Sequence, residues 1–343
     1  ADLGNAGPDQ GQGGKFLFVG PDYEGELPEG YLVFRSPTNG NAFLMRGFLV
    51  DGDPQPGVES IKKHARVYPL SRADNPPGQK FINASGLEIN TVHGNDFTFF
   101  EELNQIVQEE PAESLDPELL GLFASIGIKK GQPFEPDERM KKILTEAAAV
   151  GNATVRAFVF PGRDKAAYQY DNRYWKTAFI GGSHEFLNDG ARLLDARAFF
   201  YYYATFTTPA MILKVPGAGA QYSMATVDAG GNPLDGSKNY RLYLPPDVPA
   251  KDFWSVVVYD NQTRSMLQTD QPYPSLMSQR GVQANSDGSY DIYFGPEAPA
   301  GKESNWIQTI PGKGWNVIIR FYGPLEPWFD QTWRPDDIEL VNN

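Results

Sequence analysis

The second half of the sequence is divided into short runs in which apolar and polar residues alternate, and this pattern limits the fold more than any other feature. The runs are separated by clusters of turn-forming residues, such as DAGGNPLDGSKN and PPDVPAKD. Alternation with a period of two is typical of strands that bury one face. Closely spaced strands of this kind predict an antiparallel β-sandwich or jelly roll. The runs are residues 221–227, 240–244, 253–259, 290–294 and 315–322.

The first half has a different pattern, in which short apolar runs precede a helical segment. The predicted strands are residues 15–19 (KFLFV), 31–35 (YLVFR) and 42–50 (AFLMRGFLV). Apolar spacing and flanking Pro or Gly residues predict helices over 97–110, 118–126, 137–150 and 189–208. Gly151 is expected to end the third of these helices. We therefore expect a β-rich α+β protein with two domains: residues 1–189, which include helices, and residues 190–343, which form the sandwich.

Charge and composition exclude several classes of protein. The chain carries 30 Lys and Arg against 43 Asp and Glu, a net charge of −13. Nucleic acid is therefore not an expected partner, because phosphate binding needs clustered Lys and Arg. No apolar run approaches the roughly 18 residues that a membrane span requires. Cys is absent, which excludes disulfides, thiolate catalysis and Cys-bound metal.

No catalytic or metal-binding motif is complete. His64, His93 and His184 are far apart in the sequence. His184-Glu185 begins like a zinc-protease helix, but Asn188 stands where the second His belongs. The G-x-S-x-G motif that holds a catalytic Ser is absent. We predict no metal and no cofactor, and the sequence leaves open whether the protein is an enzyme.

The feature most typical of a binding site is the polar face of three late strands. If these strands lie in one sheet, alternation places their Arg, Tyr and Asp side chains on the face opposite the apolar one. Arg with Tyr is typical of interfaces and ligand sites, whereas plain surface favours Lys, Glu and Thr. In a ligand site the two Arg would hold an anionic group, and the Tyr would stack or donate protons. The candidate residues are Arg241, Tyr243, Asp291, Tyr293, Arg320 and Tyr322.

Long motifs in both halves carry a family resemblance. Those in the first half are residues 7–23 (GPDQGQGGKFLFVGPDY), 27–40 (LPEGYLVFRSPTNG) and 44–53 (LMRGFLVDGD). Those in the second half are residues 232–246, 251–263, 286–296, 304–315 and 320–339. They resemble the domains of unknown function 1254 and 1214, respectively, which occur together mostly in bacterial proteins. The resemblance implies a two-domain, β-rich architecture with a jelly-roll-like C-terminal half. It implies no activity, substrate or catalytic residue.

The resemblance also implies that the first domain is incomplete in this chain. Relatives usually carry a further N-terminal stretch before the segment that matches Gly7. Missing strands would leave unpaired edges, which proteins avoid, so we expect the absent piece to be a second chain or a partner to cover the edge. The chain begins with Ala1 and shows no targeting segment. We interpret this start as that of a processed or truncated product and predict a periplasmic or secreted location, with a cytoplasmic one left open.

Three functions remain compatible with the sequence. The first is a soluble protein that binds or hydrolyses a small or oligomeric organic ligand in a cleft between the domains. The second is a non-catalytic structural or interaction protein, expected to be a homo-oligomer, whose Arg/Tyr face is a domain or subunit interface. The third is a carbohydrate-binding module that stacks sugars on Trp side chains. Five of the six Trp fall in the second half: Trp254, Trp306, Trp315, Trp328 and Trp333.

Overall fold

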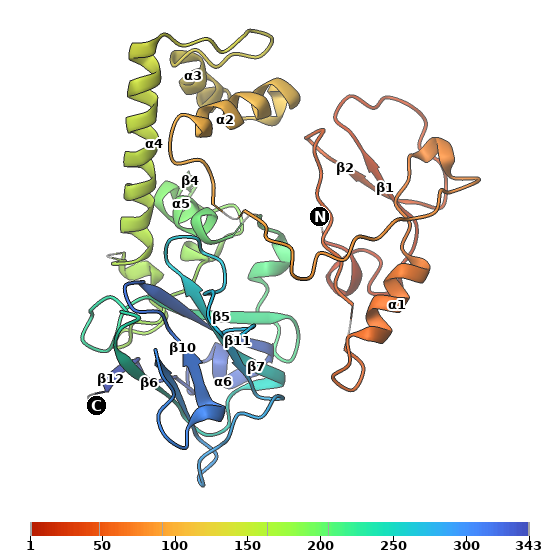
Figure 1. Ribbon diagram of the computed structural model, residues 1–343. Coiled ribbons are helices and arrows are strands. Elements are labelled where there is room, and N and C mark those ends of the chain that lie inside the picture. Colours follow the sequence, from red (N-terminus) through yellow and green to blue (C-terminus); the bar gives the residue numbers. More distant parts are fainter. Residues whose placement is uncertain (1, 48, 91, 163, 205, 342–343) are drawn as a thin grey trace. The chain divides into compact units, whose positions relative to one another are not determined.

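The computed structural model describes every residue except 1, 48, 91, 163, 205, 342 and 343 (Figure 1). The chain divides into two compact units, residues 1–148 and 149–343. Helix α4 (Glu138–Val159) runs across the division between them. In the structure, residues 149–189 group with the second unit. The domain boundary expected at residue 189 stays a prediction.

The first unit contains one small sheet and several helices. Strands β1 (Phe16–Val19) and β2 (Leu32–Arg35) pair in parallel, as two of the predicted strands. Phe18 stacks on Phe34 with the ring centroids 5.3 Å apart, so this pair packs one face of the small sheet. The helices before α4 are α1 (Gln55–His64), α2 (Thr98–Glu109) and α3 (Pro117–Ser125).

The helices begin where local chemistry favours a start. The Asp116 carboxylate accepts hydrogen bonds from the backbone N–H of Glu118 at 2.9 Å and of Leu119 at 3.3 Å, and Pro117 fills the first helical position. These contacts satisfy backbone donors that the first turn leaves without partners. The same logic applies to α4, where Asp137 accepts from the N–H of Met140 at 2.7 Å.

Two predictions for this half are wrong. Gly151 does not end α4, which continues to Val159, because Val155 and Val159 pack against a core cluster. This burial outweighs the roughly 1 kcal/mol that a Gly costs within a helix. No strand forms over the described residues of 42–50, where Val50 makes only an isolated bridge to Asp53. The run does not alternate between apolar and polar residues, so it lacks the pattern of a strand with one buried face. Phe48 lies outside the described residues.

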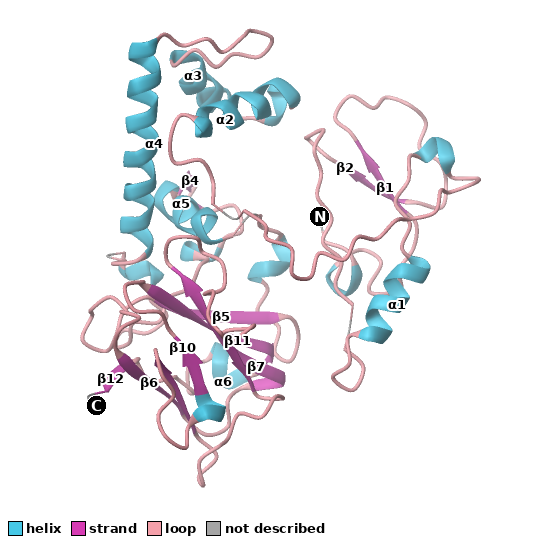
Figure 2. Ribbon diagram, viewed as in Figure 1, coloured by secondary structure: helices cyan, strands magenta, loops and turns pink. Residues whose placement is uncertain are grey.

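The second unit is built on two four-stranded sheets, drawn in magenta in Figure 2. Sheet I has the order β10–β9–β6–β12, and sheet II the order β5–β11–β7–β8. The sheet I strands are β6 (Asn239–Leu244), β9 (Tyr290–Gly295), β10 (Trp306–Gln308) and β12 (Glu339–Val341). The sheet II strands are β5 (Ala220–Ala225), β7 (Ala250–Asp260), β8 (Ser275–Met277) and β11 (Trp315–Pro324). All neighbours are antiparallel except β9 and β10, which are parallel.

The remaining elements of the second unit are short. Strands β3 (Leu187–Asn188) and β4 (Ala191–Arg192) form a hairpin. It is followed by helix α5 (Leu194–Tyr203), and helix α6 (Glu326–Phe329) follows β11. The α-helix predicted over 189–208 is therefore shorter than expected: among the described residues of that range, only α5 is α-helical. Among the described residues, no helix combines the length and apolar content that a membrane crossing requires.

One core joins the inward faces of both sheets. It contains Tyr240, Leu242, Leu244, Ile292 and Phe294 from sheet I, and Val256, Val258, Trp315, Val317, Ile319 and Phe321 from sheet II. The alternation read from the sequence correctly gives the buried side of β6 and β11. Each large apolar side chain buried here contributes about 1.5–3 kcal/mol. The predicted β-rich α+β class is confirmed, and the jelly-roll assignment stays a prediction.

A second core covers part of the outer face of sheet II. Val159 of α4, together with Phe199 and Phe200 of α5, clusters with Met224 of β5, and Ile318 of β11 packs against this group. These helices therefore bury the centre of the face that the sequence suggests is polar. The next residues along β11, Arg320 and Tyr322, lie beside this covered region.

Candidate functional site

The six candidate residues do not share a face. Arg241 and Tyr243 lie on β6, next to Asp291 and Tyr293 of β9, all in sheet I. Arg320 and Tyr322 lie on β11, which pairs with β5 and β7 in sheet II. The two sheets enclose a common core, so their outward faces point in opposite directions. The assumption of a single sheet is wrong, because alternation shows which face a side chain is on but not which sheet its strand joins.

The sheet I group is an ion-pair network in which one Arg faces two carboxylates. Arg241 donates through Nη2 to Oε2 of Glu339 at 2.7 Å, and its Nη1 lies 3.7 Å from Oδ1 of Asp291. The hydrogen bond to Glu339 is the main reason that the pKa of Arg241 is raised. Its partners sit on β12 and β9, the two neighbours of β6. This group therefore fastens three strands together and leaves the Arg241 charge fully paired.

The sheet II group contains a charge without a carboxylate partner. Among the described residues, no Asp or Glu lies within ion-pair distance of Arg320. Its guanidinium carbon instead lies 5.6 Å from the ring centroid of Tyr222 and 5.8 Å from that of Tyr259. Nη2 donates to the hydroxyl of Tyr259. Tyr322 stacks on Phe253 with the centroids 4.1 Å apart and the planes 17° apart. We call Arg320, Tyr222, Tyr259, Tyr322 and Phe253 the arginine cluster.

Burial makes this arrangement electrostatically unusual. Arg320 is half-buried, and its Nε is enclosed without a hydrogen-bond partner among the described residues. Burial opposes the charged form, yet the neighbouring hydroxyls of Tyr259 and Tyr322 outweigh it, so the pKa of Arg320 is raised. Burial raises the pKa of Tyr259, and the Arg320 charge only partly opposes it. The cluster therefore holds a permanent positive charge between neutral phenols.

Sheet geometry fixes the members of the cluster. Arg320 is paired with Tyr222 on one side and with Ser255 on the other, and Tyr322 is paired with Phe253. The regular ladder continues to Tyr322 and shifts before Pro324. Gly323 between them has a φ of 62°, and a Cβ there would lie 2.9 Å from the Asp252 carboxylate. Only Gly accommodates this turn without strain, so it fixes where β11 leaves the ladder.

Tyr222 and Tyr259 are cluster residues that the sequence-based site does not include. Both lie within runs predicted as strands, 221–227 and 253–259. Alternation could have placed both Tyr on the outward face of their strands; in β7, for example, Tyr259 lies on the side opposite the core residues Val256 and Val258. That signal becomes useful only when β5 and β7 are known to flank β11.

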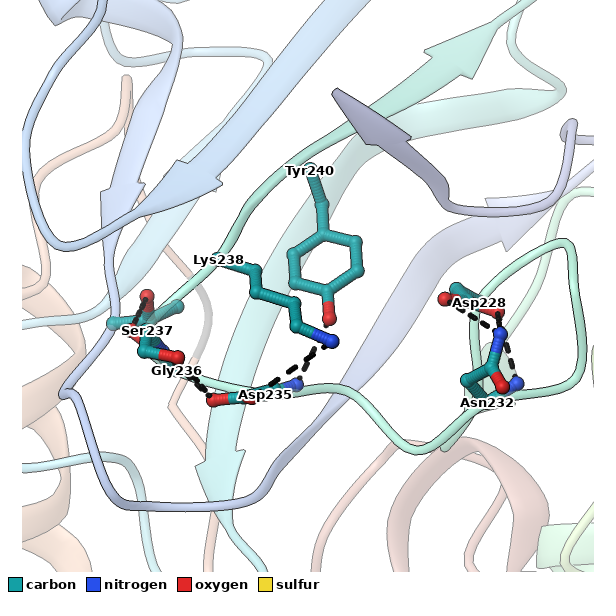
Figure 3. Close-up of polar contacts among 8 residues, drawn as sticks. Asp228, Asn232, Asp235, Gly236, Ser237, Lys238 and Tyr240 are labelled. Carbon is teal, nitrogen blue, oxygen red and sulfur yellow. Dashed lines mark hydrogen bonds and ion pairs between the residues drawn. The ribbon is translucent and has the colours of Figure 1, made fainter. Parts of the chain in front are cut away.

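The turn-rich loop before β6 forms another polar cluster, shown in Figure 3. The backbone N–H of Asp235 donates to the Tyr240 hydroxyl at 3.1 Å, and the Asp235 carboxylate accepts from the N–H and the hydroxyl of Ser237 at 2.9 and 2.8 Å. The backbone and side-chain bonds from Ser237 lower the pKa of Asp235. Asp228 similarly accepts from the N–H of Asn232 at 2.9 Å. These carboxylates already have local donors, so the loop has a structural role.

Lys176 is fully buried and has no carboxylate partner among the described residues. Its Nζ donates to the carbonyls of Val159 at 3.1 Å and Phe160 at 3.2 Å, and to the Thr226 hydroxyl at 2.9 Å. Desolvation lowers its pKa to about 8. The three acceptors match the three protons of an ammonium. Lys176 therefore caps the C-terminal end of α4, where a positive charge is favourable.

Other proposed types of site find less support. In the described parts of the chain, no three His, Asp or Glu side chains come together in a way that could hold a metal ion. Neither of two surface depressions is lined by a residue of the arginine cluster. One is lined by residues 268–270, 296 and 308–311, and the other by residues 124–127, 133–137, 139 and 140. Four of the Trp that sugar binding would need are buried in the core: Trp254, Trp315, Trp328 and Trp333.

Two families match separate parts of the chain. Residues 3–69 match the family described as "Protein of unknown function (DUF1254)", and residues 219–326 match "Protein of unknown function (DUF1214)". These two matches confirm the resemblance that the motifs of the two halves indicate.

The solved structures that are similar to this chain include the following two. The VPA0106 protein from Vibrio parahaemolyticus is 22% identical, with 98% of this chain and 77% of that chain covered and a TM-score of 0.47. A putative uncharacterized protein from Burkholderia cenocepacia is 16% identical, with 65% and 48% covered and a TM-score of 0.29. Among curated proteins, none matches the sequence.

Proposed function

We propose that the protein binds an anionic organic ligand at the arginine cluster on the outer face of sheet II. The observation that carries this proposal is the half-buried guanidinium of Arg320, which has no carboxylate partner among the described residues and an Nε without an acceptor. A charge removed from water is costly unless it is paired. A ligand carboxylate or phosphate at the guanidinium would supply the opposite charge.

The aromatic members of the cluster define the rest of the ligand. Tyr222 and Tyr259 flank the guanidinium, and the stacked pair of Tyr322 and Phe253 offers a flat, half-buried apolar surface beside it. Flat rings favour offset stacking with other planar groups. We therefore expect a small acid with a planar or apolar body. We propose binding only, because no described His or carboxylate contacts Arg320 as a general base.

The test is a calorimetric titration of the full chain with phenyl phosphate and benzoate, with benzyl alcohol as the uncharged ligand. We expect the wild type to bind the two anions, and Arg320→Ala to weaken this binding at least about tenfold. Arg241→Ala is the matched control, since that Arg is already paired with Glu339 and Asp291. Equal affinity in the wild type and Arg320→Ala would rule the site out.

A second candidate function is an interface, and one observation favours it. Helices α4 and α5 already cover Met224 and Ile318 on the same face of sheet II, so part of this face is a seam within the unit. In that case Arg320 serves stability through its Tyr contacts. No anion would bind to the wild type, and Arg320→Ala would lower the melting temperature or alter the oligomeric state.

The predicted partners and location are a separate part of this proposal. We propose that the chain is exported to the periplasm or secreted and assembles as a homo-oligomer, with a further N-terminal piece associated as a second chain. The proposed anion site at the arginine cluster does not depend on the location or the assembly. Native mass spectrometry of protein purified from its own cells tests the assembly, and cell fractionation tests the location.

A further inference from the structure

Strand β10 is an edge strand of sheet I with an unusual composition. It pairs with β9 and forms one end of sheet I. The segment 306–310 (WIQTI) contains no charged residue, Gly or Pro, and Pro311 follows it. Short uncharged segments of high β-propensity are the ones that pair edge to edge between copies of a protein. Proteins normally place a Lys, a Pro or a bulge in such a strand, so this edge needs another form of protection.

The side chain of Gln271 occupies this edge. Its Oε1 accepts a hydrogen bond from the backbone N–H of Gln308 at 2.9 Å, and its Nε2 donates to the backbone carbonyl of Trp306 at 3.2 Å. The N–H of Thr309 donates to Gly295 of β9. Successive residues direct their backbone groups to opposite sides, so the groups bound by Gln271 point away from β9. The primary amide of Gln271 thus takes the place of a peptide unit in a neighbouring strand.

A second pair of contacts holds Gln271 in place. The N–H of Asp270 donates to Oε1 of Gln308 at 3.0 Å, and Nε2 of Gln308 donates to the Asp270 carboxylate at 3.2 Å. Two adjacent loop residues are therefore bonded to the backbone and to the side chain of β10. A neighbouring strand could approach only after the loop had given up these four hydrogen bonds.

We propose that Gln271 prevents self-association of this chain through β10. The partner that it excludes is a second copy, because an antiparallel pair of identical edges is self-complementary about a two-fold axis. The outward backbone groups of Trp306 and Gln308 would then bond to the same groups of the other copy. The 306–310 segment supplies no charge of its own against this pairing, so the protection comes from the loop, in which, among the described residues, Gln271 alone binds the outward backbone groups and Asp270 binds the Gln308 side chain.

The test uses Gln271→Ala in the full chain, followed by sedimentation velocity over a concentration series. We expect this variant to self-associate with a dissociation constant at least about tenfold lower than that of the wild type. Gln279→Ala is the matched control, since that exposed Gln donates to the carbonyl of Asp252 at 3.2 Å and does not contact β10. It should sediment like the wild type.

A double variant assigns the association to this edge. Gln271→Ala with Gln308→Pro removes the outward N–H of β10, and a Pro cannot take part in a new ladder at that position. Its sedimentation should return to that of the wild type. Two results would overturn the proposal: Gln271→Ala that stays in the wild-type state, with or without lower stability, and association that persists in the double variant.

Discussion

Arg320 on β11 donates a hydrogen bond to the hydroxyl of Tyr259 on β7, and its guanidinium carbon lies 5.8 Å from the centre of the same ring. The Tyr259 side chain thus offers Arg320 both a hydrogen-bond acceptor and an aromatic ring. This relationship links the stability of sheet II to its proposed ligand site.

Tyr259→Phe should therefore destabilise the second unit. The change keeps the ring but removes the acceptor, so a partly buried guanidinium loses a hydrogen bond that is worth about 1.5–3 kcal/mol when one partner is charged. Urea unfolding measures the loss. Tyr273→Phe is the control, because Tyr273 is 68% exposed; an equal effect of both changes would contradict the role given to the Tyr259 hydroxyl.

Lys176 should make stability rise with pH in a defined window. Its pKa is about 8 in the folded chain against 10.5 for the free side chain. Between these values the unfolded chain binds more protons, so the free energy of unfolding increases with pH, by up to about 3 kcal/mol from this group. Lys176→Met should remove the increment. Parallel unfolding free energies of wild type and variant from pH 7 to pH 10.5 would contradict it.

Two Gly→Ala changes in the second unit should change the free energy of unfolding in opposite directions. A Cβ at Gly236 would lie 2.1 Å from the carbonyl oxygen of Ile310, so Gly236→Ala forces the backbone to move and should cost about 1–3 kcal/mol. A Cβ at Gly151 meets no atom within 4 Å inside helix α4, so Gly151→Ala should stabilise by up to about 1 kcal/mol. Thermal unfolding compares them, and a neutral Gly236→Ala would disprove the close contact.

Residues of sheet I illustrate how far the sequence alone can lead. Alternation correctly places Leu242 and Ile292 in the core. It cannot show that β11 joins a different sheet from β6, because strand pairing depends on contacts between distant segments. Arg241 and Arg320 consequently look equivalent in the sequence, although one is paired with Glu339 and the other has its guanidinium beside the rings of Tyr222 and Tyr259.

The helical segment shows a similar limit. Asp116 and Pro117 mark the start of α3 through local hydrogen bonds, which a sequence reveals directly. The end of α4 depends on the packing of Val159 and on the ammonium of Lys176, which comes from a separate segment. Gly151 is the local signal for the end of α4, but these tertiary contacts keep the helix going past it to Val159.

The paired state of Arg241 predicts a small, salt-dependent effect. Glu339→Gln removes the carboxylate charge from an ion pair whose side chains are 40% and 54% exposed. Exposed pairs of this kind contribute less than about 1 kcal/mol and are screened by salt. Urea unfolding at low and high salt should show a small loss that fades as salt is added. A large loss that is insensitive to salt would contradict the structural role of this network.

Nuclear magnetic resonance of the arginine side chains tests the central claim most directly. In the wild type, one Nε–Hε signal, identified as Arg320 by its disappearance in Arg320→Lys, should shift in a saturable manner when phenyl phosphate is added. The Arg241 signal should stay in place, because its guanidinium is already paired. An Arg320 signal that does not move, or that moves no more than the Arg241 signal, would contradict an anion site at the arginine cluster.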